Sequence, residues 1–339
     1  MIIVPTFNGK EVDYISSRLD TRAEFDPVNL PDNEGKQQRG VNPRGPFQIE
    51  SGIADMMFAA DDRNREVVLP FLDGNDLARN GRPSRYIINF GNMTKAEAQS
   101  YPEPFRHIEK EVLPFREALK DKKEYKSLKD NWWQYEFLAK KIDEWFENNE
   151  VAFAKSRVAS RWMFTKIDSG WVCGEATVIF FFEEAKDFAI LQSALHEHWA
   201  KVFTSTLGSL GVRYTNICFK PFPFPRDASD ESVEYANSVG NSYIQMRDDI
   251  LKERECTYNE LYRLLDDNSC TDGDITEFRE QTIKLDKSVL SMYGWGDIDY
   301  TRKMQMDNDK SRFWAEEEVI EEVLGRLIEL NRHQSQLIS

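Results

Sequence analysis

Short apolar segments rich in β-branched and aromatic residues recur through the first two thirds of the chain. EVVLPFL and RYIINF are bounded by the turn sequences DGND and GNM, which predicts two buried strands. VAFAKS, RWMFTKI and TVIFFF follow with short polar separations, and NICFK comes after a loop rich in glycine and serine. These segments predict four further strands.

Other segments repeat apolar residues with the helical period. Thr94 followed by Glu97 is a capping box, which predicts the start of a short helix. The apolar spacing of PEPFRHIEKEVLPF predicts a second helix, which Pro114 is expected to end or bend. Residues 132–148 and 191–203 have the same helical spacing.

Composition shifts divide the chain. Residues 1–60 are rich in Asp, Asn, Pro and Gly and predict a loop-rich lead-in. PFPFPRD predicts a rigid, extended exit from the first domain. Beyond it, helical periodicity and acidity occur together in residues 231–267, 274–292 and 314–333. The predicted fold class is a mixed α/β (α+β) domain at residues 1–225, followed by an α-helical C-terminal module at residues 226–339.

The composition is that of a globular chain. Hydrophobic residues make up 40% and aromatic residues 12% of the sequence, which is ordinary for a folded core. The longest apolar run, residues 176–182, is too short to cross a bilayer, and the N-terminal residues lack the apolar segment of a signal peptide. We expect a cytoplasmic protein with no membrane partner. The four cysteines form no CxxC pair, which predicts reduced thiols.

Net charge opposes nucleic-acid binding, but its distribution does not. The chain carries a net charge of −15, whereas DNA binding depends on neutralising phosphates with Lys and Arg. Residues 226–339 hold 14 basic and 26 acidic residues, so most of the negative charge lies in the C-terminal third. Residues 151–167 hold four basic residues and no acid. A DNA-facing patch is therefore compatible with the total.

Motifs of the common enzyme classes are missing. The sequence contains no G-x-G-x-x-G, Walker A, G-x-S-x-G, H-E-x-x-H or N-P-P-Y. Asp32, Glu34 and Lys36 imitate the metal-binding residues of some nucleases, but all three lie in one Pro- and Gly-rich loop. His196 and His198 are two residues apart, which places them on different sides of a helix. We therefore expect no catalytic residue, no metal and no cofactor in this chain.

The remaining candidate chemistry is recognition of DNA. Arg side chains can bond guanine in a bidentate manner, and Ser hydroxyls can bond phosphates or base edges. Small residues in a loop let the backbone approach DNA, and a tyrosine adds a stacking face. The same residues are also compatible with an ordinary solvated surface. The candidate DNA-binding residues are Lys155, Ser156, Arg157, Ser160, Arg161 and Lys166 in a strand-loop-strand segment, and Thr204, Ser205, Ser209, Arg213 and Tyr214 around a second loop.

An ordered series of motifs carries a family resemblance. The series comprises LPFLDGNDLARN, SRYIINFGNMTKAEAQSYPEPF, NWWQYEF, FAILQSALHEHWA, RYTNICFKPFPFP, LDKSVLSMYGWGD and GRLIELNRHQ. It resembles the C-terminal half of MmeI-like type IIG/IIL restriction–methylation enzymes and of related phage-defence adenine-N6 methyltransferases. The resemblance implies a target-recognition domain over residues 1–225, in which the two candidate segments face the major groove. It also implies that the N-P-P-Y motif and the S-adenosylmethionine loop lie N-terminal to this region.

These observations predict a sequence-recognition subunit that binds double-stranded DNA. It would work with a separate methyltransferase subunit that carries N-P-P-Y and binds S-adenosylmethionine, and its acidic helices would face protein rather than DNA. One alternative is that the chain is the C-terminal fragment of a single-chain methyltransferase or restriction enzyme. Another is an acidic DNA mimic or inhibitor.

Overall fold

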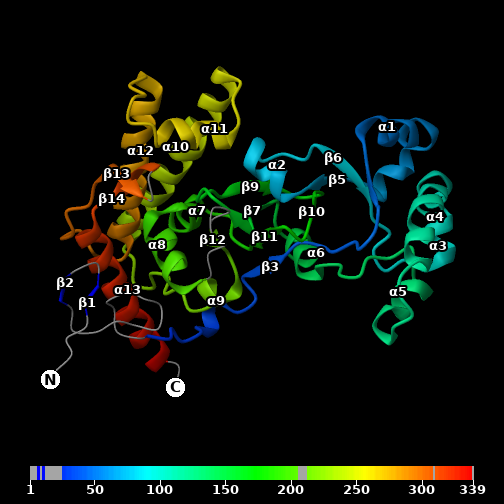
Figure 1. The fold of residues 1–339 in the computed structure, drawn as a ribbon, viewed down its shortest axis with the longest axis horizontal. Coiled ribbons are helices and arrows are strands. Elements are labelled where there is room, and N and C mark those ends of the chain that lie inside the picture. The colour runs from blue at the N-terminus through cyan, green and yellow to red at the C-terminus, as the bar shows by residue number, and fades with distance from the viewer. Residues whose placement is uncertain (1–5, 8–9, 12–24, 205–211, 308–309, 338–339) are drawn as a thin grey trace.

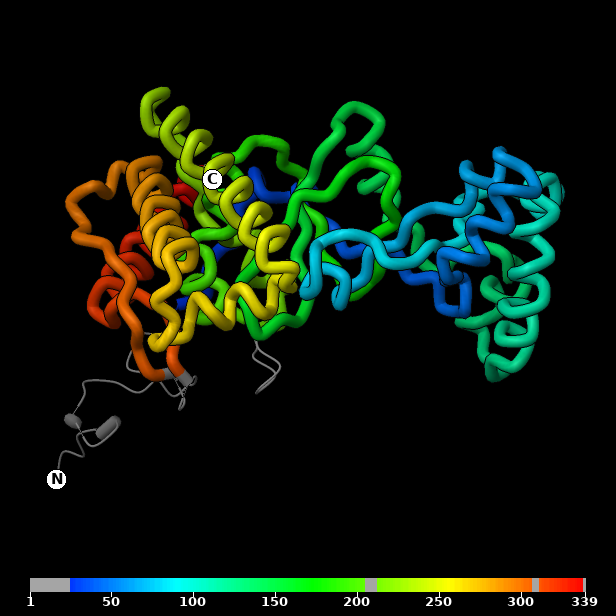
Figure 2. The backbone as a smooth tube through the Cα atoms, turned by 90° about the horizontal axis from the view of Figure 1, so that it is seen from above, coloured from blue at the N-terminus to red at the C-terminus, as the bar shows by residue number. Residues whose placement is uncertain are grey.

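The molecule is elongated, with helices at both ends and small sheets between them (Figure 1). The computed structural model describes residues 6–7, 10–11, 25–204, 212–307 and 310–337. Figure 2 shows one end formed by early segments of the chain and the other by late segments. The fold is mixed α/β with a helical C-terminal region, as the sequence predicts.

The N-terminal lobe combines a small sheet with helices. Its four-stranded sheet has the order β10-β5-β6-β4, in which β5 and β6 are antiparallel and β10 is parallel to β5. The strands are β4 (Gln48–Ile49), β5 (Val68–Leu72), β6 (Arg85–Ile88) and β10 (Val172–Cys173). The helices are α1 (Ser51–Ala60), α2 (Gly74–Arg79), α3 (Lys95–Gln99), α4 (Pro102–Glu117), α5 (Lys126–Asp130) and α6 (Lys140–Phe146).

Several predicted elements of this lobe are confirmed, and two differ. Thr94 and Glu97 form the predicted capping box of α3. Helix α4 continues past Pro114 to Glu117, because a proline in the last turn removes only one backbone hydrogen bond. Residues 132–148 are not one helix: Trp132 and Trp133 are both buried, at 5% and 8% exposure. Adjacent helical residues point in different directions, so this segment turns instead and only α6 is helical.

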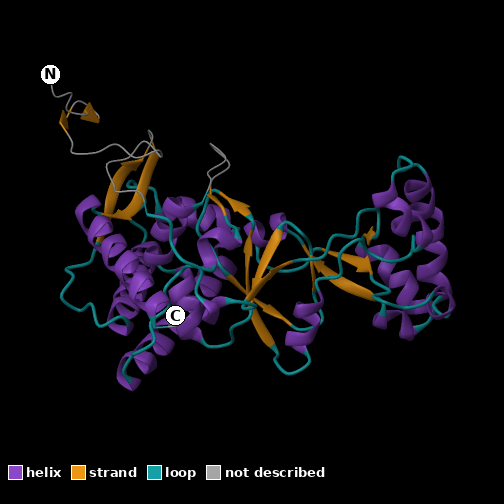
Figure 3. Cartoon of the chain, turned by 90° about the horizontal axis from the view of Figure 1, so that it is seen from below, coloured by secondary structure: helices purple, strands orange, loops and turns teal. Residues whose placement is uncertain are grey.

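The central sheet separates two hydrophobic cores. It is antiparallel, with the order β3-β11-β7-β9. Ala152 and Ala154 of β7 pack into the N-terminal core, whereas Phe153 packs into the C-terminal core. Figure 3 shows the strands of both four-stranded sheets between two groups of helices. The strands are β3 (Gln37–Arg39), β7 (Val151–Ser156), β9 (Thr165–Asp168) and β11 (Thr177–Phe180).

The C-terminal lobe is mainly helical. Segment NICFK, predicted as a strand, is the short helix α9 (Asn216–Phe219). Side-chain donors satisfy carbonyls in this region, since Asn33 bonds the Phe222 carbonyl at 2.7 Å and Trp199 bonds the Cys218 carbonyl at 2.9 Å. The other elements are α7 (Ala185–Gln192), α8 (Ala194–Phe203), α10 (Asp230–Arg254), α11 (Tyr258–Leu265), α12 (Gly273–Met292), β13 (Arg302–Asp307), β14 (Lys310–Ala315) and α13 (Glu317–Gln336). The hairpin β13–β14 interrupts a module that the sequence predicts to be helical.

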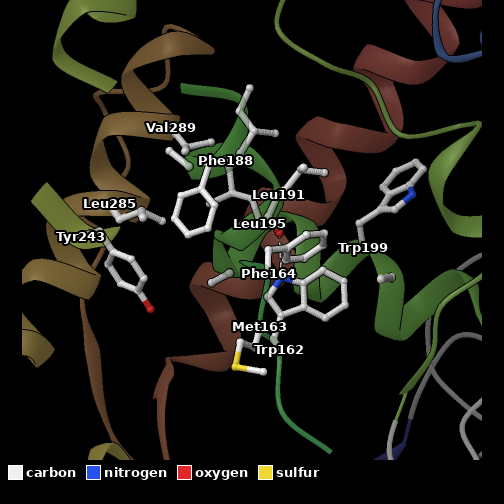
Figure 4. Packing of buried hydrophobic residues seen from close by; sticks show 14 of the residues in the cluster. Trp162, Met163, Phe164, Phe188, Leu191, Leu195, Trp199, Tyr243, Leu285 and Val289 are labelled. Carbon is white, nitrogen blue, oxygen red and sulfur yellow. Dashed lines mark hydrogen bonds between the residues drawn. The ribbon is translucent and has the colours of Figure 1, made fainter. Parts of the chain in front are cut away.

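The C-terminal core includes residues from both sides of residue 225. It extends from Phe153 to Leu327 without a division at that position. Tyr243 of α10 lies against Phe188 of α7, with ring centroids 5.9 Å apart. Figure 4 shows Tyr243 and other side chains of the late helices packed with those of the central region. The predicted domain boundary at residue 225 is therefore not a boundary between cores.

Ion pairs join the loop at residues 31–36 to the segment at residues 220–226. Asp32 pairs with Arg226 at 2.7 Å and Glu34 pairs with Lys220 at 2.7 Å, so the loop resembling a nuclease motif makes structural ion pairs. Among the described residues, no group of three or more His, Cys, Asp or Glu could hold a metal ion. No helix in the described part of the chain is long and apolar enough to cross a membrane. Strands β1 (Thr6–Phe7) and β2 (Lys10–Glu11) form a separate small hairpin.

Candidate nucleic-acid interface

The two candidate segments form one two-stranded ribbon. Strand β8 (Val158–Ala159) pairs antiparallel with β12 (Val212–Arg213), and Arg213 lies opposite Val158. The ribbon continues one residue further, since the Tyr214 amide donates to the Arg157 carbonyl at 2.8 Å. The segments are distant in sequence, yet their backbone hydrogen bonds place Arg157 and Arg213 in the same antiparallel pair of strands. We call β8 and β12, with Arg157 and Tyr214, the ribbon.

A broad hollow lies beside the ribbon. Its volume is about 680 Å³, and it is open to solvent. Its walls come from the ribbon, from the start of α2, from the turn before β11 and from α11. The polar and charged side chains at its wall include Asp73, Asn75, Arg157, Arg161, Glu175, Arg213 and Asn259. We call this space the ribbon hollow.

The cations of the ribbon hollow are not equivalent. Arg161 pairs with Asp266, whereas Arg157 and Arg213 have no ion pair among the described residues. Burial lowers the pKa of Arg161 to about 10, so its guanidinium stays charged at neutral pH. Asp73 pairs with Arg85, which partly neutralises its carboxylate. The two unpaired guanidiniums on the ribbon are therefore the groups most available to an anion.

A second hollow lies on the other side of Arg157. It has a volume of about 450 Å³, and its wall includes Gln38, Arg39, Lys141, Arg157, Thr215 and Lys220. Its only carboxylate among the lining residues, Glu34, is bonded to Lys220, and that bond lowers the pKa of Glu34. The buried Gln38 Oε1 and Thr215 Oγ1 have no hydrogen-bond partner within the described structure. We call this space the strand-edge hollow. Arg157 borders both hollows and joins them into one cationic tract.

Most predicted residues that the structure describes are on this face. Ser156, Arg157, Ser160, Arg161 and Arg213 all line the ribbon hollow. The Ser156 hydroxyl donates to the Val158 carbonyl at 2.9 Å, which holds the start of the ribbon. The hydroxyl of Thr204 donates to the Arg213 carbonyl at 2.6 Å and closes the base of the second loop. Lys166 is exposed on β9 but lines neither hollow. Ser205 and Ser209 lie outside the described residues.

Two predicted surface residues are buried, and for these the sequence prediction is corrected. Lys155 is 1% exposed, and its Nζ lies 4.6 Å from the centroid of the Trp162 ring. Tyr214 is 0% exposed, and its hydroxyl lies 2.8 Å from His196 Nε2. Neither side chain can contact a duplex in this conformation. The cause is the central sheet, because β7 is covered on both faces and offers no solvent side for Lys155.

Sequence reasoning missed several polar residues at the tract, four of which we take as candidates for DNA contacts. Asn75 and Asn259 face the ribbon hollow, and Arg39 and Lys141 face the strand-edge hollow. The DGND turn after a predicted strand offered a signal for Asn75, since loops at strand ends often carry function. Asn259 offered none, because it belongs to an acidic helix that the sequence places in another module. Carboxamides and guanidiniums together can bond both base edges and phosphates.

This arrangement defines a mixed α/β module with a cationic face. The family model "MmeI, target recognition domain" matches residues 37–226, more than half of the chain. The chain therefore belongs to the MmeI target recognition domain family, which confirms the resemblance carried by its motifs.

Comparison with solved structures gives the same fold. The type IIL restriction-modification enzyme MmeI, solved in complex with DNA, matches with a TM-score of 0.71 and 15% sequence identity. The match covers 96% of this chain and 39% of the MmeI chain. At this identity the match shows that the fold is shared, including the helical C-terminal lobe. No curated protein matches the chain.

Proposed function

We propose that this chain binds double-stranded DNA and supplies sequence specificity to a restriction-modification or DNA-methylation system. The observation that carries the proposal is the ribbon, which brings the unpaired Arg157 and Arg213 together above one open hollow. The family's name, target recognition, and the DNA in the solved MmeI structure support the same role.

The arginine and asparagine side chains of this face would bind different parts of DNA. Arg157 and Arg213 would bond phosphates or the acceptor edge of guanine, and Asn75 and Asn259 would bond base edges. The ribbon is a two-stranded β-ribbon, and the major groove of B-DNA is wide enough to admit such an element. The strand-edge hollow, with Arg39 and Lys141, would continue the phosphate contacts beyond the ribbon.

The methyl transfer itself would be performed by residues outside this chain. Adenine methylation requires a base taken out of the duplex and a bound S-adenosylmethionine, and the chain contains no N-P-P-Y motif. We infer that a methyltransferase subunit carrying that motif binds S-adenosylmethionine and works with this chain in the cytoplasm. A role in phage defence would follow from such a system.

Binding to duplex DNA tests the recognition proposal. Fluorescence anisotropy over a salt series, after selection of a preferred site from random duplexes, should give an affinity that falls with salt. Arg157→Ala and Arg213→Ala should each reduce the salt slope by about 0.9 for a lost phosphate contact, or change the preferred base at one position. Lys110→Ala is the matched control, because Lys110 is 81% exposed on α4 of the distant lobe. Absence of duplex binding at every salt concentration would favour the acidic DNA mimic.

Methylation mapping tests the catalytic partnership. The chain would be co-expressed with a polypeptide that carries N-P-P-Y from the same genome, and modified adenines would be mapped. Methylation at one motif with the pair, but not with either polypeptide alone, supports two subunits. Motif-specific methylation by the partner alone would contradict the specificity role.

A further inference from the structure

Asp266 joins the C-terminal lobe to the ribbon face. It follows α11 in the chain, and its carboxylate is 12% exposed. One oxygen, Oδ2, pairs with Arg161 and also with Arg312 of β14, the latter at 3.2 Å. The other oxygen, Oδ1, accepts a hydrogen bond from the Phe313 amide at 2.9 Å. The carboxylate at the end of α11 is thus held by β14 and by the loop that follows β8.

The contact holds Arg161 in a defined place. The Arg161 side chain is 22% exposed and that of Arg312 is 27% exposed, so both guanidiniums are more shielded than a free surface cation. Arg312 also donates to the Ser160 carbonyl at 3.3 Å, which ties β14 to the end of β8. Since Arg161 lines the ribbon hollow, its charge would face bound DNA if Asp266 did not hold it.

Neutralising a cation near bound DNA lowers the sequence-independent part of the affinity. Phosphate contacts add affinity for every sequence, whereas base contacts distinguish one sequence from another. A cation that is free to reach phosphate therefore strengthens binding to wrong sites. A cation that is neutralised by a neighbouring carboxylate does so less.

We propose that Asp266 is a positioning residue that withholds Arg161 from DNA phosphates and so limits the sequence-independent part of the affinity for duplex DNA. The inference rests on the proposed function, and it assigns control of part of that affinity to the C-terminal lobe. It also modifies the expectation that the acidic helices face only protein, because one of their carboxylates acts at the ribbon hollow.

The test compares Asp266→Asn with the wild-type chain on a selected target duplex and a scrambled duplex, across a salt series. Release of Arg161 should make the salt slope on scrambled duplex steeper by about one and tighten that binding about fivefold near 100 mM salt. Binding to the target duplex should tighten by a similar factor, because a phosphate contact adds to the affinity for both duplexes. The double variant Asp266→Asn with Arg161→Gln should return the slope to the wild-type value.

Two further variants separate positioning from charge and from folding. Asp267→Asn is the matched control, because Asp267 is the next residue and is exposed. Its carboxylate accepts hydrogen bonds from Ser269 and pairs with no arginine among the described residues. The substitution therefore changes the net charge equally without releasing Arg161. Asp266→Glu should keep the wild-type salt slope. If Asp266→Asn folds poorly in a thermal melt, Asp266→Ser gives the same charge change while keeping an oxygen acceptor for the Phe313 amide.

The possible outcomes are distinguishable. A wild-type chain that binds no duplex removes the proposed function. A wild-type chain that discriminates, with Asp266→Asn and Asp266→Ser leaving both the salt slope and the affinity for scrambled duplex unchanged, overturns this inference alone. An equal change with Asp267→Asn would also overturn it, because the effect would then be net charge and not position.

Discussion

At the residue scale, burial of one charged side chain predicts an unusual dependence of stability on pH. Burial lowers the pKa of Lys155 to about 8 from its ordinary value of 10.5. The folded state therefore loses this proton before the unfolded state does. The penalty is complete below pH 8, where it amounts to about 3 kcal/mol, and it disappears as the pH rises to 10.5. The aromatic faces of Trp162 and Phe164 offset part of this penalty.

Lys155→Met should therefore increase the free energy of unfolding at pH 7 by about 1–3 kcal/mol. It should also flatten the rise in stability between pH 8 and pH 10. Urea denaturation at pH 7 and pH 9.5 measures both effects. Lys166→Met, in the neighbouring strand and exposed, is the control and should change neither quantity. A loss of stability with Lys155→Met at pH 7 would mean that the aromatic contacts outweigh the burial.

The same residues show the reach of sequence reasoning. Sequence reasoning named Arg157 from the cation cluster at residues 151–167 and Arg213 from the second loop, and the structure places both on the ribbon. That reasoning could not separate them from Lys155, because the alternation of a strand identifies an exposed face only when one face of its sheet is solvated. The pairing of Asp266 with Arg161 was equally invisible, since their contact joins segments that the composition assigns to different modules.

At the element scale, helix α8 contains two buried neutral histidines. Burial lowers the pKa of His196 to about 3 and places that of His198 well below 6.5. The unfolded chain binds a proton at each site below pH 6.5, whereas the folded chain does not. Stability is therefore lost as the pH falls through this range, by about 2 kcal/mol for each histidine at pH 5.

Comparison of His198→Leu with the wild-type chain isolates one of these histidines. The free energy of unfolding should fall by about 2 kcal/mol less between pH 7 and pH 5 in the variant. His198 is the better choice, because its Nε2 makes no hydrogen bond within the described structure, whereas His196 bonds Tyr214. His333→Leu on α13 provides the control variant. Identical pH profiles for wild type and His198→Leu would refute the assignment of a neutral buried imidazole.

The ribbon gives a second prediction at this scale. Thr204 Oγ1 donates to the Arg213 carbonyl, so its hydroxyl positions one strand of the ribbon. Thr204→Val keeps the shape and removes this hydrogen bond, which is worth about 1 kcal/mol. Affinity for the target duplex should fall about fivefold, with an unchanged salt slope because no cation is lost. Thr94→Val is the control: it removes a helix cap in the distant lobe and should leave anisotropy titrations unchanged. A reduced slope for Thr204→Val would contradict a purely positional role.

Local sequence patterns predicted an element correctly where residues of that element satisfy its backbone hydrogen bonds. The capping box of α3 and the periodicity of α10 and α12 depend on neighbouring residues, so the sequence is sufficient. NICFK failed because its carbonyls accept hydrogen bonds from Asn33 and Trp199, which belong to distant segments. The pairing of β8 with β12 likewise depends on tertiary contacts, and each strand is only two residues long. No local pattern specifies such a pairing.

At the scale of the whole molecule, the chain's charge and its cores divide at different places. Most of the negative charge follows residue 225, and the family model ends at residue 226. The hydrophobic core, however, continues from the central sheet into α10 and α12. Amino-acid composition mainly reflects the surface of a module, whereas cooperative unfolding depends on the buried contacts within it. The late helices should therefore behave as part of the recognition module.

Removal of the late helices tests this directly. A chain ending at residue 225 would expose the partners of Tyr243, Phe278 and Leu285, each of which is buried in the shared core. Each such side chain contributes about 1.5–3 kcal/mol, and a domain has only about 5–15 kcal/mol in total. The truncated chain should lose the cooperative urea transition of the C-terminal core, in which Trp162 and Trp199 lie, as measured by tryptophan fluorescence. As a control, a full chain cut by a protease site inserted after Pro225, with both pieces retained, should still unfold cooperatively. If the truncated chain instead unfolds with the same urea midpoint as the full chain, the two parts are independent domains. The effect of Asp266 on the ribbon would then have to arise without a shared core.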